Sequence, residues 1–275
     1  MSFCGSLRYR VIKIYANVSK SILAFHLKIF PSVRRELPRY EPASRKATSS
    51  RHIPRIIWQT NYSRSVTLQV YACFRFNRLL SSTHEYHFHD DEACDRFVKE
   101  SYPEETWQAY KRLQIGAARA DFWRILVLLK HGGLYLDIDA NFVDFPERFI
   151  GADADDMFVV MKNGEITNYF LASAPGNPIL REICDRIVKN INDGVLPGVF
   201  EMTGPIVVDA VVKELGVKFV SYKKACVQGQ FTNKKGQYAD KPDGVWTIAQ
   251  KRIPVLAKQD EKNEPAASDE QLDGR

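Results

Sequence analysis

Two aspartates one residue apart, Asp137 and Asp139, end an apolar segment that reads LYLDID. Because side chains alternate along a strand, both carboxylates are expected on one face, at a strand end where a buried sheet meets a cleft. Such a pair suits a hard divalent cation, Mn²⁺ or Mg²⁺, which prefers oxygen ligands and is often shared with substrate phosphates. The alternative is that the aspartates cap a turn and stay solvated.

A second charged pair, Asp121 and Arg124, precedes them. Residues three apart are neighbours on one helix face, and this face also carries apolar Ala117 and Leu128. Half-buried charges cost stability unless they are partnered. We expect both side chains to reach the cleft, where they can bind hydroxyl groups and phosphate oxygens. A simple ion pair within the helix is the alternative.

The elements that position these charges are a helix, a glycine stop and a short strand. Apolar residues recur at helical spacing between Ala117 and Lys130, and no glycine or proline interrupts them. His131 and the Gly132-Gly133 pair are helix-stop signals. The glycines let the helix end pack closely on the strand start.

The rest of the chain predicts an α/β domain over residues 52–257, with a mixed, mostly parallel sheet flanked by helices. The sequence patterns predict strands at 53–60, 84–91, 157–161 and 218–222, and a strand that ends in a turn at 167–178. They predict helices at 65–80, 92–99, 102–113 and 178–192, and a further helix that Thr203 or Gly204 caps and that begins at Pro205. Residues 45–52 are polar and indicate a linker. Residues 258–275 are charged and almost free of apolar side chains, which predicts a disordered tail.

The net charge of +6 is unevenly distributed. Residues 1–51 hold eleven Lys and Arg against two acidic residues, whereas the remainder has a net charge of −3. The main domain is therefore not a general polyanion binder, and no nucleic acid partner is expected.

Residues 1–51 predict a basic amphipathic helix followed by a linker. Apolar residues at a 4-3-4-3-4 spacing form one stripe: Val11, Tyr15, Val18, Ile22, Phe25 and Ile29. Two interpretations remain open, namely a helix on an anionic membrane surface through residues 8–39 and a helix packed on its own domain. An Arg-rich transit peptide also fits the composition. No uncharged run approaches the ~20 residues that span a bilayer.

Cysteine and histidine usage gives weaker signals. The five cysteines are scattered and never in C-x-x-C spacing, which favours a reducing compartment over disulfides or a zinc site. His84, His87 and His89 could bind a metal, but without a second cluster they are better explained as surface histidines.

The segment ARADFWRILVLLKHGGLYLDID resembles the core of the DXD-containing sugar transferases of glycosyltransferase family thirty-two. The resemblance continues through IPRIIWQT (53–60), HEYHFHDD (84–91), NYFLASAPGNP (168–178) and TGP (203–205). The family includes outer-chain mannosyltransferases and capsule and lipopolysaccharide transferases. The resemblance implies a GT-A fold, a Mn²⁺-dependent nucleotide-sugar donor and retention of anomeric configuration.

The resemblance also assigns roles to residues. It implies that Asp121 holds donor-sugar hydroxyls, that Arg124 lies near the sugar and diphosphate, and that Asn168 lies near the donor. Asp137 corresponds to the first DXD aspartate, at the ribose, the sugar and the metal, and Asp139 to the direct metal ligand.

Trp58 stands where some members have a tryptophan that stacks on the nucleobase. Fungal members more often read IPKIIHQTW, so this chain has Trp58 for the His and Asn61 for the Trp. Trp58 is equally consistent with a core aromatic residue. Many members carry a C-terminal His before a Trp, whereas YADKPDGVWTI offers Trp246 and no His.

These features predict a hexosyltransferase that acts on a glycan or lipid-linked glycan acceptor in surface polysaccharide synthesis. We expect it in the cytoplasm, peripheral at the inner face of the cell membrane. Two alternatives are a haloacid-dehalogenase-like phosphatase with Asp137 as nucleophile and a non-catalytic sugar-binding descendant of the transferase fold.

Overall fold

The computed structural model describes residues 3–257, so the predicted tail at 258–275 lies outside the described residues. A seven-stranded sheet has the order β10-β8-β9-β6-β3-β5-β2. Five of its strands run in one direction, and β9 and β2 run against them. This confirms the predicted α/β class with a mixed, mostly parallel sheet. The strands are β2 (Tyr40–Glu41), β3 (Ile56–Thr60), β5 (Glu85–His89), β6 (Gly133–Leu136), β8 (Asp156–Val160), β9 (Ile166–Ser173) and β10 (Phe219–Ser221).

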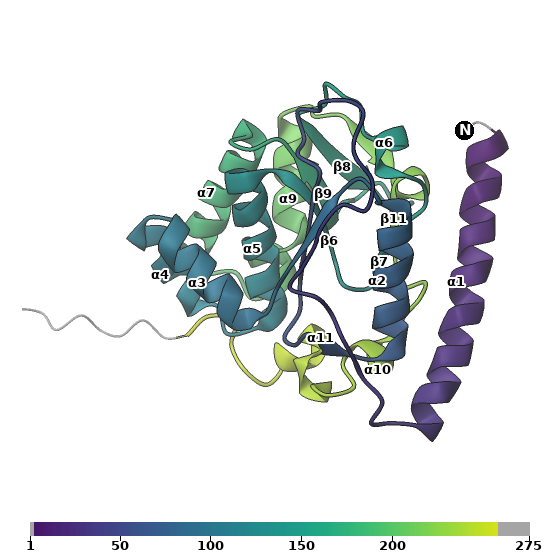
Figure 1. The fold of residues 1–275 in the computed structure, drawn as a ribbon. Coiled ribbons are helices and arrows are strands. Elements are labelled where there is room, and N and C mark those ends of the chain that lie inside the picture. The colour runs from purple at the N-terminus through teal and green to yellow at the C-terminus, as the bar shows by residue number, and fades with distance from the viewer. Residues whose placement is uncertain (1–2, 258–275) are drawn as a thin grey trace, which may run out of the picture.

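Helices cover one face of the sheet and a smaller mixed layer covers the other (Figure 1). The first layer comprises α3 (Asp91–Ser101), α4 (Glu104–Arg112), α5 (Gly116–His131), α7 (Pro178–Asp193), α8 (Val199–Met202) and α9 (Pro205–Glu214). The second comprises α2 (Leu68–Leu80), α6 (Pro146–Phe149) and a ribbon of β7 (Ala140–Phe142) and β11 (Cys226–Gln228). Neighbouring strand residues alternate between the two cores, as Trp58 and Ile57 do.

The remaining elements lie at the periphery. The long helix α1 (Phe3–Ile29) runs beside α2 on the outside of the second layer (Figure 1). Strands β1 (Arg35–Glu36) and β4 (Ser65–Val66) form a separate antiparallel pair. After β10 come η1 (Tyr222–Lys224), α10 (Lys234–Gln237), η2 (Pro242–Gly244) and α11 (Trp246–Ala249).

Part of the segment 1–51, which the sequence pattern separated from the main domain, belongs to the globular fold. β2 adds an edge strand to β5, and Leu37 is fully buried. The polar stretch at 45–52, which was predicted as a linker, is also bonded to the domain. Arg51 donates hydrogen bonds to the backbone carbonyls of Ile150 and Glu147. Strands of two residues carry no alternation that a sequence pattern could reveal.

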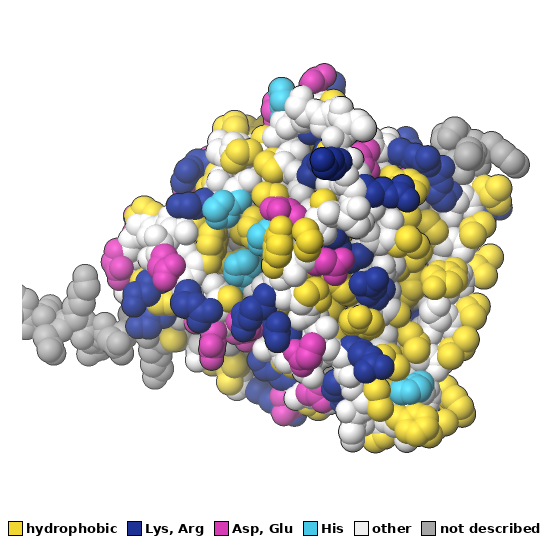
Figure 2. Space-filling view, in the orientation of Figure 1, with side chains coloured by type: hydrophobic (Ala, Val, Ile, Leu, Met, Phe, Trp, Pro, Cys, Tyr) yellow, Lys and Arg dark blue, Asp and Glu magenta, His cyan; other side chains and the backbone are white. Residues whose placement is uncertain are grey.

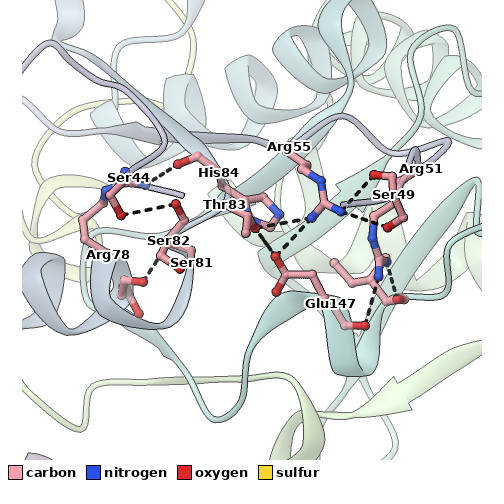
Figure 3. A network of polar contacts seen from close by, with 12 residues as sticks. Ser44, Ser49, Arg51, Arg55, Arg78, Ser81, Ser82, Thr83, His84 and Glu147 are labelled. Atoms are coloured by element: carbon pink, nitrogen blue, oxygen red, sulfur yellow. Dashed lines mark hydrogen bonds and ion pairs between the residues drawn. The ribbon is translucent and has the colours of Figure 1, made fainter. Parts of the chain in front are cut away.

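Glu147 organises the contacts around this stretch (Figure 3). Its carboxylate accepts hydrogen bonds from Thr83 and from Arg55 Nη1, the latter at 3.1 Å, while Arg55 Nη2 donates to the Ser49 carbonyl. His84 lies 3.7 Å from the same carboxylate, and burial lowers the pKa of His84 to about 4. Residues 49–55 are thereby fixed to the loop that carries α6.

The two glycines between α5 and β6 allow a close approach that no other residue permits. Gly133 has φ +103°, and a Cβ there would lie 2.7 Å from the Ile56 carbonyl oxygen. Gly132 has φ +65°, and its Cβ would meet Pro54 and Pro175 at 2.8 Å. Its carbonyl accepts the indole N–H of Trp58 at 2.8 Å. The glycine stop therefore sets how the helix meets the sheet.

The Gly133→Ala variant should lower the free energy of unfolding by about 3 kcal/mol, because strain at positive φ adds to a backbone clash. Gly164→Ala is the matched control, since Gly164 also has a positive φ but a Cβ there meets nothing within 4 Å. The control should cost about 1 kcal/mol. Urea denaturation measures both, and equal losses would contradict the packing role of Gly133.

Candidate active site

A cleft of about 690 Å³ opens at the carboxyl end of β6. Its walls come from the first half of α5, the turn after β6, strand β9, the end of β11 and the segment from α10 to α11. Five of the six residues predicted for the site line it: Asp121, Arg124, Asp137, Asp139 and Asn168. The sixth, Trp58, does not.

Arg124 joins the helix to the strand end. Its Nη2 lies 3.1 Å from Asp121 Oδ1 and donates to Asp137 Oδ1 at 2.9 Å. Its Nη1 donates to the Asn168 carbonyl at 2.8 Å, and its guanidinium lies 4.5 Å from the centre of the Tyr135 ring. Arg124 therefore contacts one aspartate of each charged pair, as the sequence predicted. Its contacts extend beyond a simple ion pair within the helix.

Asn168 and Tyr135 complete the contacts of these carboxylates. The Asn168 amide donates to Asp121 Oδ1 at 3.0 Å, and the Tyr135 hydroxyl donates to Asp137 Oδ1 at 2.8 Å. These donors hold both carboxylates at fixed positions on the cleft wall.

The D-x-D segment is a turn and not the continuous strand that its alternation predicted. β6 ends at Leu136, and the amide of Ala140 donates to the Asp137 carbonyl at 2.9 Å. The chain turns here because β7 pairs with β11 instead of with the main sheet. The carboxylates of Asp137 and Asp139 still converge, since the Gln228 amide donates to both, at 3.0 and 3.1 Å.

Negative charge exceeds positive charge at this point of the cleft. Arg124 pairs with Asp121 and Asp137, whereas Asp139 has no ion pair within residues 3–257. Burial and the charge of Asp137 raise the pKa of Asp139 to about 7. Burial raises the pKa of Asp137 as well, although Arg124 opposes the shift.

These residues fit a divalent cation. Asp137 and Asp139 present hard oxygen ligands to one point, where the Gln228 amide donates a hydrogen bond to each carboxylate. Burial raises the pKa values of both carboxylates. The described residues contain no cluster of three or more His, Cys, Asp or Glu that could hold a metal. A cation here would therefore need further ligands from substrate or water, as Mg²⁺ commonly does.

Trp58 lies in the core behind the cleft. It is 6% exposed, its indole N–H is bonded to Gly132, and its ring stacks on His131 with centres 5.5 Å apart. This position matches the core-aromatic alternative, and the ring is not free to stack on a nucleobase in the cleft.

Only one of the three predicted surface histidines, His84, is buried. His84 is 3% exposed beside Glu147, and His87 and His89 pack against Trp58, with ring centres at 4.7 and 5.7 Å. The surface interpretation is therefore wrong for His84, whereas His87 and His89 are partly exposed.

Two polar contacts of the site did not emerge from the sequence patterns. Tyr135 lies two residues before Asp137, but no pattern in the sequence indicates its hydrogen bond to that carboxylate. Gln228 lies 89 residues after Asp139, at the end of a three-residue strand that shows no recognisable period. Only the pairing of β11 with β7 brings Gln228 to the two aspartates, and no local sequence pattern indicates this pairing.

Asp121 should make the stability of the metal-free protein depend on pH. Burial raises its pKa from 3.8 to about 7, although Arg124 opposes the shift. The folded state therefore binds this proton more tightly than the unfolded state, so its stabilisation is complete below about pH 4 and lost as the pH rises through about 7.

Asp121→Asn should remove part of this dependence. The free energy of unfolding of the parent should fall by a few kcal/mol between about pH 5 and about pH 8, and the variant should fall less. Urea denaturation across this range measures the difference. Parallel curves for the two proteins would contradict the raised pKa of Asp121.

The chain resembles glycosyltransferases in sequence. A family model described as "Glycosyltransferase sugar-binding region containing DXD motif" matches residues 63–154, which include both charged pairs. The chain is 29% identical over 200 residues to an initiation-specific alpha-1,6-mannosyltransferase of Schizosaccharomyces pombe, with 61% of this chain and 50% of the relative covered. It is 32% identical over 107 residues to an uncharacterised glycosyltransferase of Acanthamoeba polyphaga mimivirus, with 38% and 41% covered.

The chain spans half or less of the length of these relatives. Among solved structures, it is similar to the PaToxG glycosyltransferase, at 16% identity and a TM-score of 0.47, with 74% of this chain and 80% of that chain covered. The family model covers the segment that carries both charged pairs of the cleft, and the sequence matches support a glycosyltransferase family for this chain.

Proposed function

We propose that the chain is a metal-dependent glycosyltransferase of the GT-A type, which moves a hexose from a nucleotide sugar to a glycan acceptor. The observation that carries the proposal is the Arg124 unit, in which one buried guanidinium joins Asp121 and Asp137 beside a second carboxylate that has no ion pair in the described chain. A diphosphate with a divalent cation would complete this charge arrangement. The similarity to the mannosyltransferase also supports sugar transfer, and it favours membership of glycosyltransferase family thirty-two.

Each charged residue has a role in this proposal. Asp139 and Asp137 hold Mn²⁺ or Mg²⁺, and Arg124 attracts the diphosphate oxygens. Asp121, supported by the Asn168 amide, accepts hydrogen bonds from donor-sugar hydroxyls. When bound, the cation supplies charge neutralisation for the departing nucleoside diphosphate.

The proposed reaction retains anomeric configuration. The acceptor hydroxyl attacks on the face from which the diphosphate leaves, so the mechanism needs no enzymic nucleophile. Asp121 is suited to orient the sugar rather than attack it, because its Oδ1 already contacts Arg124 and Asn168. Fixed donors and acceptors of this kind lower the barrier by positioning the reactants.

The proposed acceptor is a glycan or lipid-linked glycan of the surface polysaccharide type, such as capsule or lipopolysaccharide, with the enzyme at the inner face of the cell membrane. Cys73, Cys94, Cys184 and Cys226 are buried and free, as a reducing compartment would allow. No helix within residues 3–257 is long and apolar enough to cross a membrane.

The alternative phosphatase reaction fits the geometry less well. It needs a free Asp137 oxygen as nucleophile, whereas Oδ1 accepts from Arg124 and Tyr135 and Oδ2 accepts from Gln228. A non-catalytic sugar-binding protein would not need the full set of four charges that line the cleft.

Asp139→Asn and Asp137→Asn should each reduce donor hydrolysis and sugar transfer in the presence of Mn²⁺ at least about a hundredfold, because each removes charge that balances the cation. Asp193→Asn, at the exposed end of α7 and outside the cleft, is the matched control and should keep the parent rate.

Several outcomes of this experiment would contradict the proposal. Full turnover in both cleft variants would exclude the metal pair, and an aspartyl-phosphate trapped at Asp137 would favour the phosphatase. NMR of the product anomer should show retention, and an inverted product would contradict the proposed direction of attack.

A further inference from the structure

Helix α1 carries a continuous apolar stripe that faces away from the domain. We define the α1 stripe as seven side chains, each between 53% and 66% exposed: Leu7, Val11, Ile14, Val18, Ile22, Phe25 and Ile29. At 1.5 Å per residue, this stripe is about 33 Å long. Hydrophobic side chains accordingly run along the right-hand edge of Figure 2, over α1. Soluble monomers rarely expose a contiguous apolar patch of this extent unless it binds something.

The domain holds α1 through a different face. Ala16 is fully buried against Cys73 and Phe231, and Lys20 Nζ donates to the Gly229 carbonyl at 3.0 Å. The Gln69 amide donates to the Lys20 carbonyl at 2.9 Å. Of the two interpretations of this helix, packing on the domain therefore accounts for the inner face and leaves the α1 stripe uncovered.

Basic side chains follow one edge of the stripe. Arg10 and Lys28 are exposed, and at 100° per residue both lie beside the α1 stripe on the same side, whereas Lys13 lies farther round the helix. No acidic residue occurs before Glu36 in the sequence. An apolar face with positive charge along its border is complementary to a surface that is apolar inside and anionic outside.

We infer that the α1 stripe is a docking surface for an anionic lipid membrane. A second copy of the chain is a poorer occupant, because two paired α1 helices would bring Lys and Arg of both copies together without an acidic partner. On the membrane, the α1 stripe enters the boundary between headgroups and acyl chains while Arg10 and Lys28 contact anionic headgroups.

The same helix is attached to the cleft. Lys20 is bonded to the carbonyl of Gly229, and the Gly229 amide donates to the Asp139 carbonyl at 2.9 Å. Two hydrogen bonds thus connect α1 with the backbone of the D-x-D turn. A membrane-bound α1 would fix the orientation of the cleft relative to the lipid surface.

The experiment measures binding of the full chain to vesicles, without any sugar donor, so it is independent of the proposed transferase activity. Binding to vesicles of phosphatidylcholine with phosphatidylglycerol should exceed binding to phosphatidylcholine alone. Ile22→Ser with Phe25→Ser should weaken partitioning about tenfold, and Arg10→Gln with Lys28→Gln should weaken it to a similar extent.

The matched control is Val195→Ser with Leu215→Ser, which removes two exposed apolar side chains from loops outside α1 and should bind as the parent does. Circular dichroism of each variant verifies that the fold is kept. Equal binding by the parent and the α1 stripe variant would overturn the inference. So would a parent that sediments as a dimer and becomes a monomer with Ile22→Ser and Phe25→Ser, because a second copy would then cover the stripe.

Discussion

The site depends on the contacts of one buried guanidinium. Arg124 comes from the middle of α5, but its partners come from the same helix, from the turn after β6 and from β9. A cation taken out of water is tolerated only where charges and carbonyls surround it, so the helix and the two strands must meet at this point. Gly132 and Gly133 allow α5 and β6 to approach each other closely, so that the Arg124 side chain can reach both elements.

This constraint also explains why the cleft is charged. The contacts that stabilise Arg124 use Asp121 and Oδ1 of Asp137. Gln228 donates to Oδ2 of Asp137 and to Oδ1 of Asp139. Gln228 is a neutral donor and cannot balance the charge of two carboxylates. Burial raises the pKa values of Asp137 and Asp139, and the charge of Asp137 raises that of Asp139 further. A divalent cation with a diphosphate would balance the two carboxylates.

Local signals in the sequence were sufficient for α5, its glycine stop, β6 and the shared face of Asp121 and Arg124. Each follows from spacing within a few residues. The turn at Asp139 and the contact with Gln228 depend on the pairing of β7 with β11, which joins segments far apart in the chain. Trp58 illustrates a different limit, because an indole suits a core or a stacking site equally, and only the bond to Gly132 decides between them. Five of the seven side chains of the α1 stripe were visible in the sequence pattern, but which face of the helix the domain would bury was not.

The most direct test of the charge arrangement is a thermal-shift panel of UDP-, GDP-, CDP- and TDP-sugars with the full chain, each with and without Mn²⁺. A donor that binds the folded state at about a hundred times its dissociation constant stabilises it by about 2.7 kcal/mol. We predict that one nucleotide class raises the melting temperature by several degrees, that the rise requires Mn²⁺, and that Asp139→Asn abolishes it. A rise that is independent of the metal or unchanged in Asp139→Asn, or no rise with any donor, would contradict this account of the site.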